Sequence, residues 1–176
     1  MSYDVNFYYV ADASDRTAEA RRLYFDHTER EPYPKEQSRR QRVVEELLAF
    51  HPTLKCEPDD RGFAYGCSVW SEDDECEMMP VDFGVDKAFV SFSYSADPEF
   101  IFELLNRIIA VFERHGYAAF DGQVDDVITA DGSLVQSAGE FTRTFHTVVS
   151  HIEGMGETII PPVRTHRKAK PWWKFW

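Results

Sequence analysis

Four aspartates of one short segment, Asp121, Asp125, Asp126 and Asp131, come closest to a catalytic or metal-binding set, and two of them precede a glycine. Carboxylates that converge near turns can bind Mg²⁺, and a pair of them can act as general acid and general base. Asp-Gly pairs are also ordinary turn residues. The segment therefore has two interpretations: a set of turns, which is the simpler one, or an enzyme site near Asp121–Asp131.

The histidines and cysteines form no metal or nucleophile motif. No two of the six histidines are four residues apart, and His146 and His151, five apart, face different sides of a helix. The three cysteines, Cys56, Cys67 and Cys76, are spaced 11 and 9 apart, which fits neither a zinc site nor a disulfide framework. Strand alternation puts Cys67 on an apolar side, where a thiol is usually inert. We therefore expect no metal ion.

Two further kinds of site are not indicated. The acidic stretch Glu72–Glu77 lacks the alternating ligands and the glycine of a calcium loop, so it reads as a charged turn in water. The chain also has neither a phosphate-binding glycine loop nor a dinucleotide fingerprint. We predict no cofactor and no small-molecule ligand, and an enzyme is less expected than a binding protein.

The end of the chain, Arg164–Trp176, is opposite in charge to everything before it. It contains five of the 19 lysines and arginines, none of the 31 aspartates and glutamates, and three of the four tryptophans. The first 163 residues thus have 14 basic and 31 acidic side chains, a formal charge of −17. Aromatic surface gains nothing from water, so we expect something to cover it. The predicted partner-binding residues are Arg167, Lys168, Lys170, Trp172, Trp173, Lys174, Phe175 and Trp176.

This basic aromatic tail has three interpretations. Its cations can attract an anionic membrane while its indoles lie at the headgroups. Its aromatic residues can instead fill pockets on a protein partner, as interface hot spots do. The third interpretation is that the tail folds back on the acidic remainder of the chain and its tryptophans complete the core.

The composition limits the classes of partner. A net charge of −12 argues against nucleic acid, because phosphates would be repelled, and it suits a basic protein. The first residues have neither a basic nor an apolar signal region, and no window approaches 18 consecutive apolar residues. A cytoplasmic protein is the expectation.

Periodicity predicts the elements that would position these residues. Strand-like alternation marks residues 3–9, 63–69, 79–85, 90–94, 117–120 and 124–129, and the runs at 79–85 and 90–94 look like a hairpin. Helical spacing marks residues 16–28, 35–50, 98–115 and 137–152. Gly116 is expected as the left-handed stop of the third helix.

The order of these elements predicts an α+β fold. We expect a two-layer sandwich, an antiparallel or mixed sheet with helices packed on one face, followed by a C-terminal helix and the tail. Residues 1–160 would be a single domain, and Pro161-Pro162 would mark a stiff joint before the tail at 161–176.

Two segments together carry a resemblance. The opening Met1–Tyr8 and the passage Arg114–Asp121 resemble small, acidic, mostly uncharacterised bacterial α+β proteins. Several proteins of this general kind serve as immunity partners of secreted toxins. The resemblance implies a protein–protein role and assigns no functional residue.

These observations lead to three hypotheses of function. The first is a non-enzymatic binding protein, immunity-like, that masks a basic protein partner through an acidic surface. The second is a peripheral membrane or scaffold protein recruited through the Trp-rich tail. The third is an enzyme with the carboxylate site near Asp121–Asp131.

Overall fold

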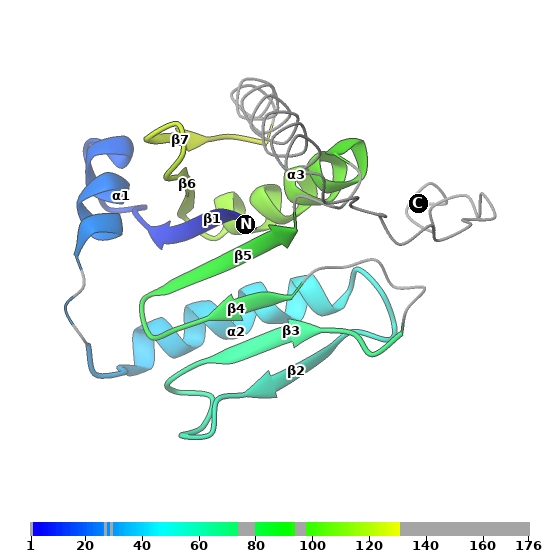
Figure 1. The fold of residues 1–176 in the computed structure, drawn as a ribbon. Helices are drawn as coiled ribbons and strands as arrows, with labels where there is room; N and C mark the ends of the chain where they lie inside the picture. The colour runs from blue at the N-terminus through cyan, green and yellow to red at the C-terminus, as the bar shows by residue number, and fades with distance from the viewer. Residues whose placement is uncertain (1, 27, 29, 74–79, 94–97, 131–176) are drawn as a thin grey trace, which may run out of the picture.

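The computed structural model describes residues 2–26, 28, 30–73, 80–93 and 98–130, which form one seven-stranded sheet and three helices (Figure 1). The strands are β1 (Ser2–Tyr9), β2 (Lys55–Pro58), β3 (Cys67–Trp70), β4 (Val81–Phe83), β5 (Lys87–Ser93), β6 (Tyr117–Asp121) and β7 (Asp126–Ile128). The helices are α1 (Arg16–Phe25), α2 (Pro34–Leu48) and α3 (Pro98–Arg114).

The strands lie in the order β2-β3-β4-β5-β1-β6-β7, and all neighbouring pairs are antiparallel. The first strand of the chain is therefore central, between β5 and β6. The expected α+β class is confirmed, with an antiparallel sheet over the described residues. The expected hairpin of β4 and β5 is also confirmed, and the Gly84 N–H donates to the Lys87 carbonyl at 2.8 Å to close it.

The main core lies between one face of the sheet and helices α2 and α3. Alternation along β1 places Val5 and Phe7 on this face, where neither is exposed. The Phe112 ring of α3 stacks on Phe7 with centroids 3.9 Å apart, and Leu47 of α2 is fully buried beside them. Burial of each such side chain is worth about 1.5–3 kcal/mol, so this layer carries most of the apolar stabilisation.

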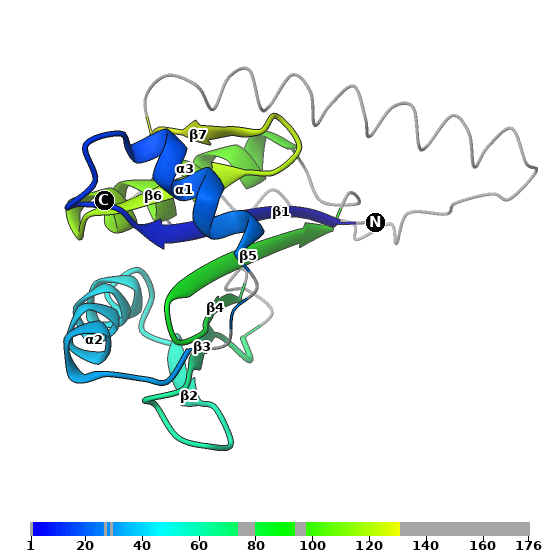
Figure 2. The same ribbon diagram turned by 90° about the vertical axis from the view of Figure 1, so that its left-hand side faces the viewer.

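Helix α1 lies on the opposite face, so the prediction that the helices pack on one face is wrong for α1 (Figure 2). Its Ala20 is fully buried in a second cluster with Tyr8 and Phe120. The Tyr24 ring lies 5.0 Å from that of Phe120. The reason is that β1 and β6 carry apolar side chains on both of their faces, and each face needs a cover. Over these two strands the described chain has three layers.

The region between α2 and β4 also differs from the prediction. The strand expected over residues 63–69 begins only at Cys67, because residues 59–66 form turns in which the Asp59 N–H donates to the Gly66 carbonyl at 3.0 Å. The edge strand β2 was not predicted. It has mostly exposed side chains and ends in Pro58, so it shows no apolar alternation.

The end of α3 agrees with the prediction. Gly116 follows the helix with φ 83°, and its N–H donates to the Glu113 carbonyl at 3.0 Å. A side chain here would meet Ala11, since an added Cβ would lie 2.6 Å from the Ala11 Cβ. Only glycine fits both the conformation and the space.

Other predictions concern residues outside those described: the helix over 137–152, the domain boundary at 160 and the tail. Within the described ranges, none of the helices combines the length and the apolar composition that crossing a membrane requires.

Candidate functional site

The predicted partner-binding residues of the tail lie outside the described residues, so their role stays a prediction. The described part of the chain presents two other places to consider. One is the aspartate segment that follows β6. The other is the face of the sheet that α2 and α3 leave uncovered.

The described aspartates of the first place are engaged in local structure. Asp121 is fully buried and accepts the Gln123 N–H at 2.8 Å, as a turn requires. Asp126 pairs with Asp121 across the two strands, and its carboxylate accepts the N–H of Val127 at 2.7 Å. These contacts support the turn interpretation. Asp131 lies outside the described residues.

Asp125 has a structural role as well. Its φ of 55° is the one positive value at a non-glycine residue in the described chain. Arg21 of α1 binds both its carboxylate, at 3.0 Å from Nε, and its carbonyl, at 2.6 Å. The aspartate thus ties α1 to the turn between β6 and β7.

Cys67 is buried, and burial together with the nearby Cys56 raises the pKa of its thiol, so the reactive thiolate is disfavoured. The expectation that Cys67 packs as an apolar residue is consistent with its place in the main core. Among the residues that the structure describes, no group of three or more histidines, cysteines or acidic residues could hold a metal ion.

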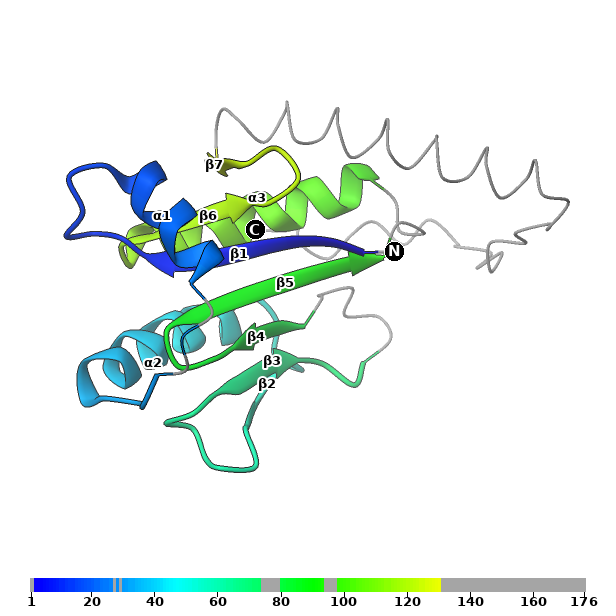
Figure 3. The same ribbon diagram turned by 60° about the vertical axis from the view of Figure 1, so that its left-hand side comes forward.

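The second place is a continuous polar surface, which we call the open face. It lies on the side of β2 to β5 and of the adjoining part of β1 that faces away from α2, and no described helix covers β2 to β5 there (Figure 1). The long strands β1 and β5 run side by side along it (Figure 3). The side chains that alternate with the core residues form it: Asp4, Asn6, Lys55, Glu57, Ser68, Trp70, Asp82, Lys87, Phe89 and Ser91.

One row of directly paired residues crosses five strands of the open face. In order from β2 to β1, the row is Glu57, Ser68, Asp82, Phe89 and Asn6. The Ser68 hydroxyl donates to the Asp82 carboxylate. Phe89, in the same row, keeps 37% of its surface exposed. An aromatic ring therefore lies in the open directly beside a carboxylate.

Further hydrogen bonds order the face on either side of this row. The Trp70 indole N–H donates to the Glu57 carboxylate at 3.1 Å, and the Ser91 hydroxyl donates to Asp4 at 2.5 Å. Lys55 forms an exposed ion pair with Glu72 at 2.9 Å. The face thus presents carboxylates and aromatic rings in fixed relative positions.

An acidic hollow of about 430 Å³ lies at the end of strands β2, β3 and β4. Its lining includes Glu57, Asp59, Asp60 and Asp82, and neither a lysine nor an arginine is among its described lining residues. The Arg61 N–H and guanidinium donate to Asp59 and lower the pKa of that carboxyl. Asp59 thus already has a cation beside it, and the carboxylates of Glu57, Asp60 and Asp82 give the hollow the negative charge that favours cationic ligands.

A second hollow, of about 540 Å³, lies between the open face and α1. It is lined by both charges, Asp4 and Lys87, and by the aromatic rings of Phe89 and Tyr24. Phe89 borders this hollow, while its paired neighbour Asp82 borders the acidic one. The two hollows are therefore parts of one surface.

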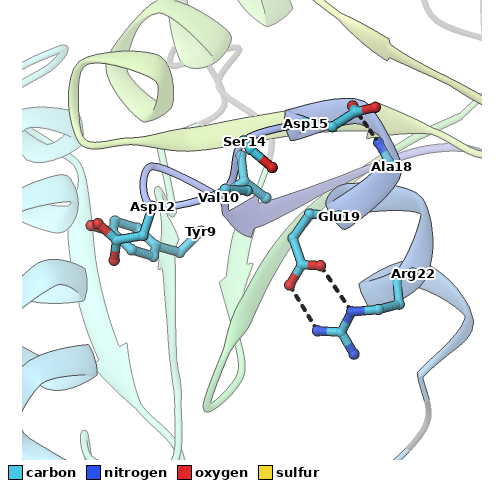
Figure 4. A pocket seen from close by; sticks show the side chains of 9 residues that line it. Tyr9, Val10, Asp12, Ser14, Asp15, Ala18, Glu19 and Arg22 are labelled. Carbon is cyan, nitrogen blue, oxygen red and sulfur yellow. Dashed lines mark hydrogen bonds and ion pairs between the residues drawn. The ribbon is translucent and has the colours of Figure 1, made fainter.

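A third hollow, of about 610 Å³, lies at the start of α1 on the opposite side of the sheet from α2 (Figure 4). Three of its charged groups already have partners at the cap of the helix or within it. Asp15 caps α1 by accepting the Ala18 N–H at 3.0 Å, and Glu19 pairs with Arg22 at 2.8 Å. We assign it a structural role.

Arg40 of α2 joins two loops beside β3 and β4. It is buried, and its guanidinium donates to the carbonyls of Phe63, of Gly84 at 2.7 Å and of Val85 at 3.2 Å. These carbonyls belong to the two loops that border β3 and β4. A single side chain therefore holds together the loop before β3 and the turn between β4 and β5.

Arg40 was not predicted from the sequence, although the sequence contains a signal for it. Arg40 precedes Val43, Val44 and Leu47 by three, four and seven residues, so it lies on the apolar stripe of α2. A charged residue on such a stripe needs a buried partner. Its partners are carbonyls of irregular loops, which leave no mark in the sequence.

Comparison of the chain with protein-family models, with curated proteins and with solved structures finds no match in any of the three.

Proposed function

We propose that this chain is a non-enzymatic binding protein that takes a basic, aromatic segment of a protein partner on the open face of its sheet. The observation that carries the proposal is the acidic hollow beside the exposed ring of Phe89. Lysines and arginines of a partner would meet the carboxylates, and an apolar side chain would cover the ring.

The charge of the chain fits this role. With a net charge of −12 it attracts a cationic partner over a distance, which speeds the encounter and makes it depend on salt. The Debye length is about 10 Å at 0.1 M salt and about 3 Å at 1 M. Binding by the open face should therefore weaken strongly over this range.

A pull-down from the lysate of the native host tests the proposal. The bait would be the full chain, a face variant with Glu57→Gln and Asp60→Asn, and a control variant with Glu31→Gln and Glu45→Gln. All four positions are exposed, and both variants remove the same charge. The control changes lie on α2 and in the loop before it, away from the open face.

We expect the full chain and the control variant to recover the same basic protein at low salt. Recovery should fall at high salt and in the face variant. Equal recovery by the face variant and the control variant would contradict the proposed face. Recovery of nothing by the full chain under either condition would contradict the binding role.

Masking of a toxin, as immunity proteins do, is one form of this function. The resemblance of residues 1–8 and 114–121 to acidic bacterial proteins supports that form, and identification of the recovered protein would test it. Recruitment to a membrane or a scaffold through the tail stays a separate proposal, which rests on the cations and indoles of residues 164–176.

A further inference from the structure

We propose that the chain's own C-terminal tail, Arg164–Trp176, is a ligand of the open face and competes there with the partner. This inference rests on the proposed function, because it takes the open face as a binding surface. It adds a regulatory step: a partner has to displace the tail before it reaches the face.

The first argument is complementarity. The tail has five cations and no acidic residue, and its last five positions include three tryptophans and a phenylalanine. The open face and the acidic hollow at its edge together offer carboxylates at Glu57, Asp60 and Asp82 and the rings of Trp70 and Phe89. Cations and indoles of the tail thus meet the chemistry that we propose for an external partner.

The second argument is reach. The described chain ends at Ala130, just after β7, and 33 residues separate it from Arg164. Five strand spacings of about 4.8 Å each separate β7 from β3, so the distance across the sheet is about 24 Å. Fully extended, such a segment spans about 110 Å, and with the helix predicted over residues 137–152 it still spans about 80 Å. The tail can therefore reach the acidic hollow.

The third argument is effective concentration. A tethered ligand whose linker matches the span is present at its site at about millimolar concentration. Weak docking, with a dissociation constant near 1 mM, would then fill about half of the faces. Such docking lowers the apparent affinity of a partner by about twofold, and tighter docking lowers it by more.

Carbodiimide cross-linking of the full chain tests the inference directly. The reagent joins a lysine amine to a nearby carboxylate as an amide and takes up the water as its urea. Lys168, Lys170 and Lys174 supply the amines. Mass spectrometry then identifies which carboxylates have joined them.

We expect the tail lysines to join Glu57, Asp59, Asp60 or Asp82 on the order of tenfold more often than the exposed Glu31 and Glu45. The excess should disappear at 1 M salt. It should also fall when Trp172 and Trp173 are both replaced by alanine, and that variant should recover more partner than the full chain does.

Three results would overturn the inference. One is an even distribution of cross-links over the surface. Another is that, in an equal mixture of ¹⁴N and ¹⁵N protein, the cross-links join different copies, which would make the tail a dimer contact. The last is that the chain binds vesicles of anionic lipid and shows no cross-link to the face, which would make the tail a membrane ligand.

The two proposals can fail separately. Recovery of a partner without cross-links to the face would contradict docking of the tail but would support the binding role. Cross-links to the face without recovery of any partner would support docking of the tail but would contradict the proposed binding of an external partner.

Discussion

At the scale of single residues, Arg40 shows how a buried charge can organise a surface. Burial lowers the pKa of its guanidinium, which is the sign of a desolvation cost. The carbonyls of two loops offset that cost by accepting its hydrogen bonds. Arg40 thus links the loop before β3 to the turn between β4 and β5.

We predict that Arg40→Met lowers the free energy of unfolding by about 3 kcal/mol. Methionine fills a similar space but leaves the carbonyls of Phe63, Gly84 and Val85 without this donor. Arg40→Lys should recover part of the loss, because one ammonium cannot span both loops as the planar guanidinium does. Urea denaturation measures both changes.

Arg42→Met is the matched control for this prediction. Arg42 is exposed two residues further along the same helix, so its replacement should change the free energy of unfolding by no more than about 0.5 kcal/mol. A loss in Arg40→Met as small as that of the control would show that the guanidinium does not hold the two loops.

At the scale of elements, the sequence predicted what local pattern determines. The opening strand β1, the long amphipathic helix α3 and the hairpin of β4 and β5 all follow from alternation or helical spacing, and all are confirmed. Two features depend on tertiary pairing and were missed. The edge strand β2 has no apolar alternation, and the side of the sheet that α1 covers depends on which face of β1 and β6 still needs burial.

The sequence predicted the negative charge of the candidate site but not its location or its residues. The acidic character of the chain predicts an acidic surface, but it does not say where that surface lies. The open face brings together Glu57, Asp82 and Asn6 from strands that are far apart in the sequence. Their register across the sheet decides the site, and one sequence does not reveal strand order.

The turn after α3 provides a prediction at this scale. Gly116→Ala should destabilise the protein by about 3 kcal/mol, because the new Cβ needs a positive φ and also meets Ala11 and the Tyr9 ring. Gly62→Ala separates the two causes. Gly62 has φ 100° but nothing within 4 Å of an added Cβ, so its loss should be about 1 kcal/mol.

Thermal and urea unfolding of the two variants would measure the difference. The excess in Gly116→Ala reports the contact between the end of α3 and the segment after β1. Equal losses in both variants would mean that this contact relaxes freely and does not constrain the chain.

At the scale of the whole molecule, charge has two separate uses. The acidic hollow at the open face gathers carboxylates, and its described lining has neither a lysine nor an arginine, which favours an external or tethered basic ligand. Elsewhere the carboxylates hold elements together. Glu46 of α2 binds both Arg114 at the end of α3 and His115, whose Nε2 lies 2.8 Å away. Acid should therefore affect binding and folding through different residues.

The second use leads to a prediction about acid. Partial burial raises the pKa of Glu46, but the hydrogen bonds and charges of Arg114 and His115 outweigh it, so the pKa is lower than the usual 4.5. The stabilisation by Glu46 is thus full above pH 4.5 and is lost as the pH falls through the lower folded value. We expect Glu46→Gln to cost about 0.5–1 kcal/mol at pH 6 and much less at pH 3.

Glu45→Gln is the control that isolates this effect. Glu45 is exposed next to Glu46, and Gln41 donates to its carboxylate at 3.0 Å. Protonation of the many other carboxylates affects both variants alike, so the difference between their unfolding midpoints reports Glu46 alone. That difference should shrink between pH 6 and pH 3. If it stayed constant, the link between α2 and α3 would not depend on the charge of Glu46.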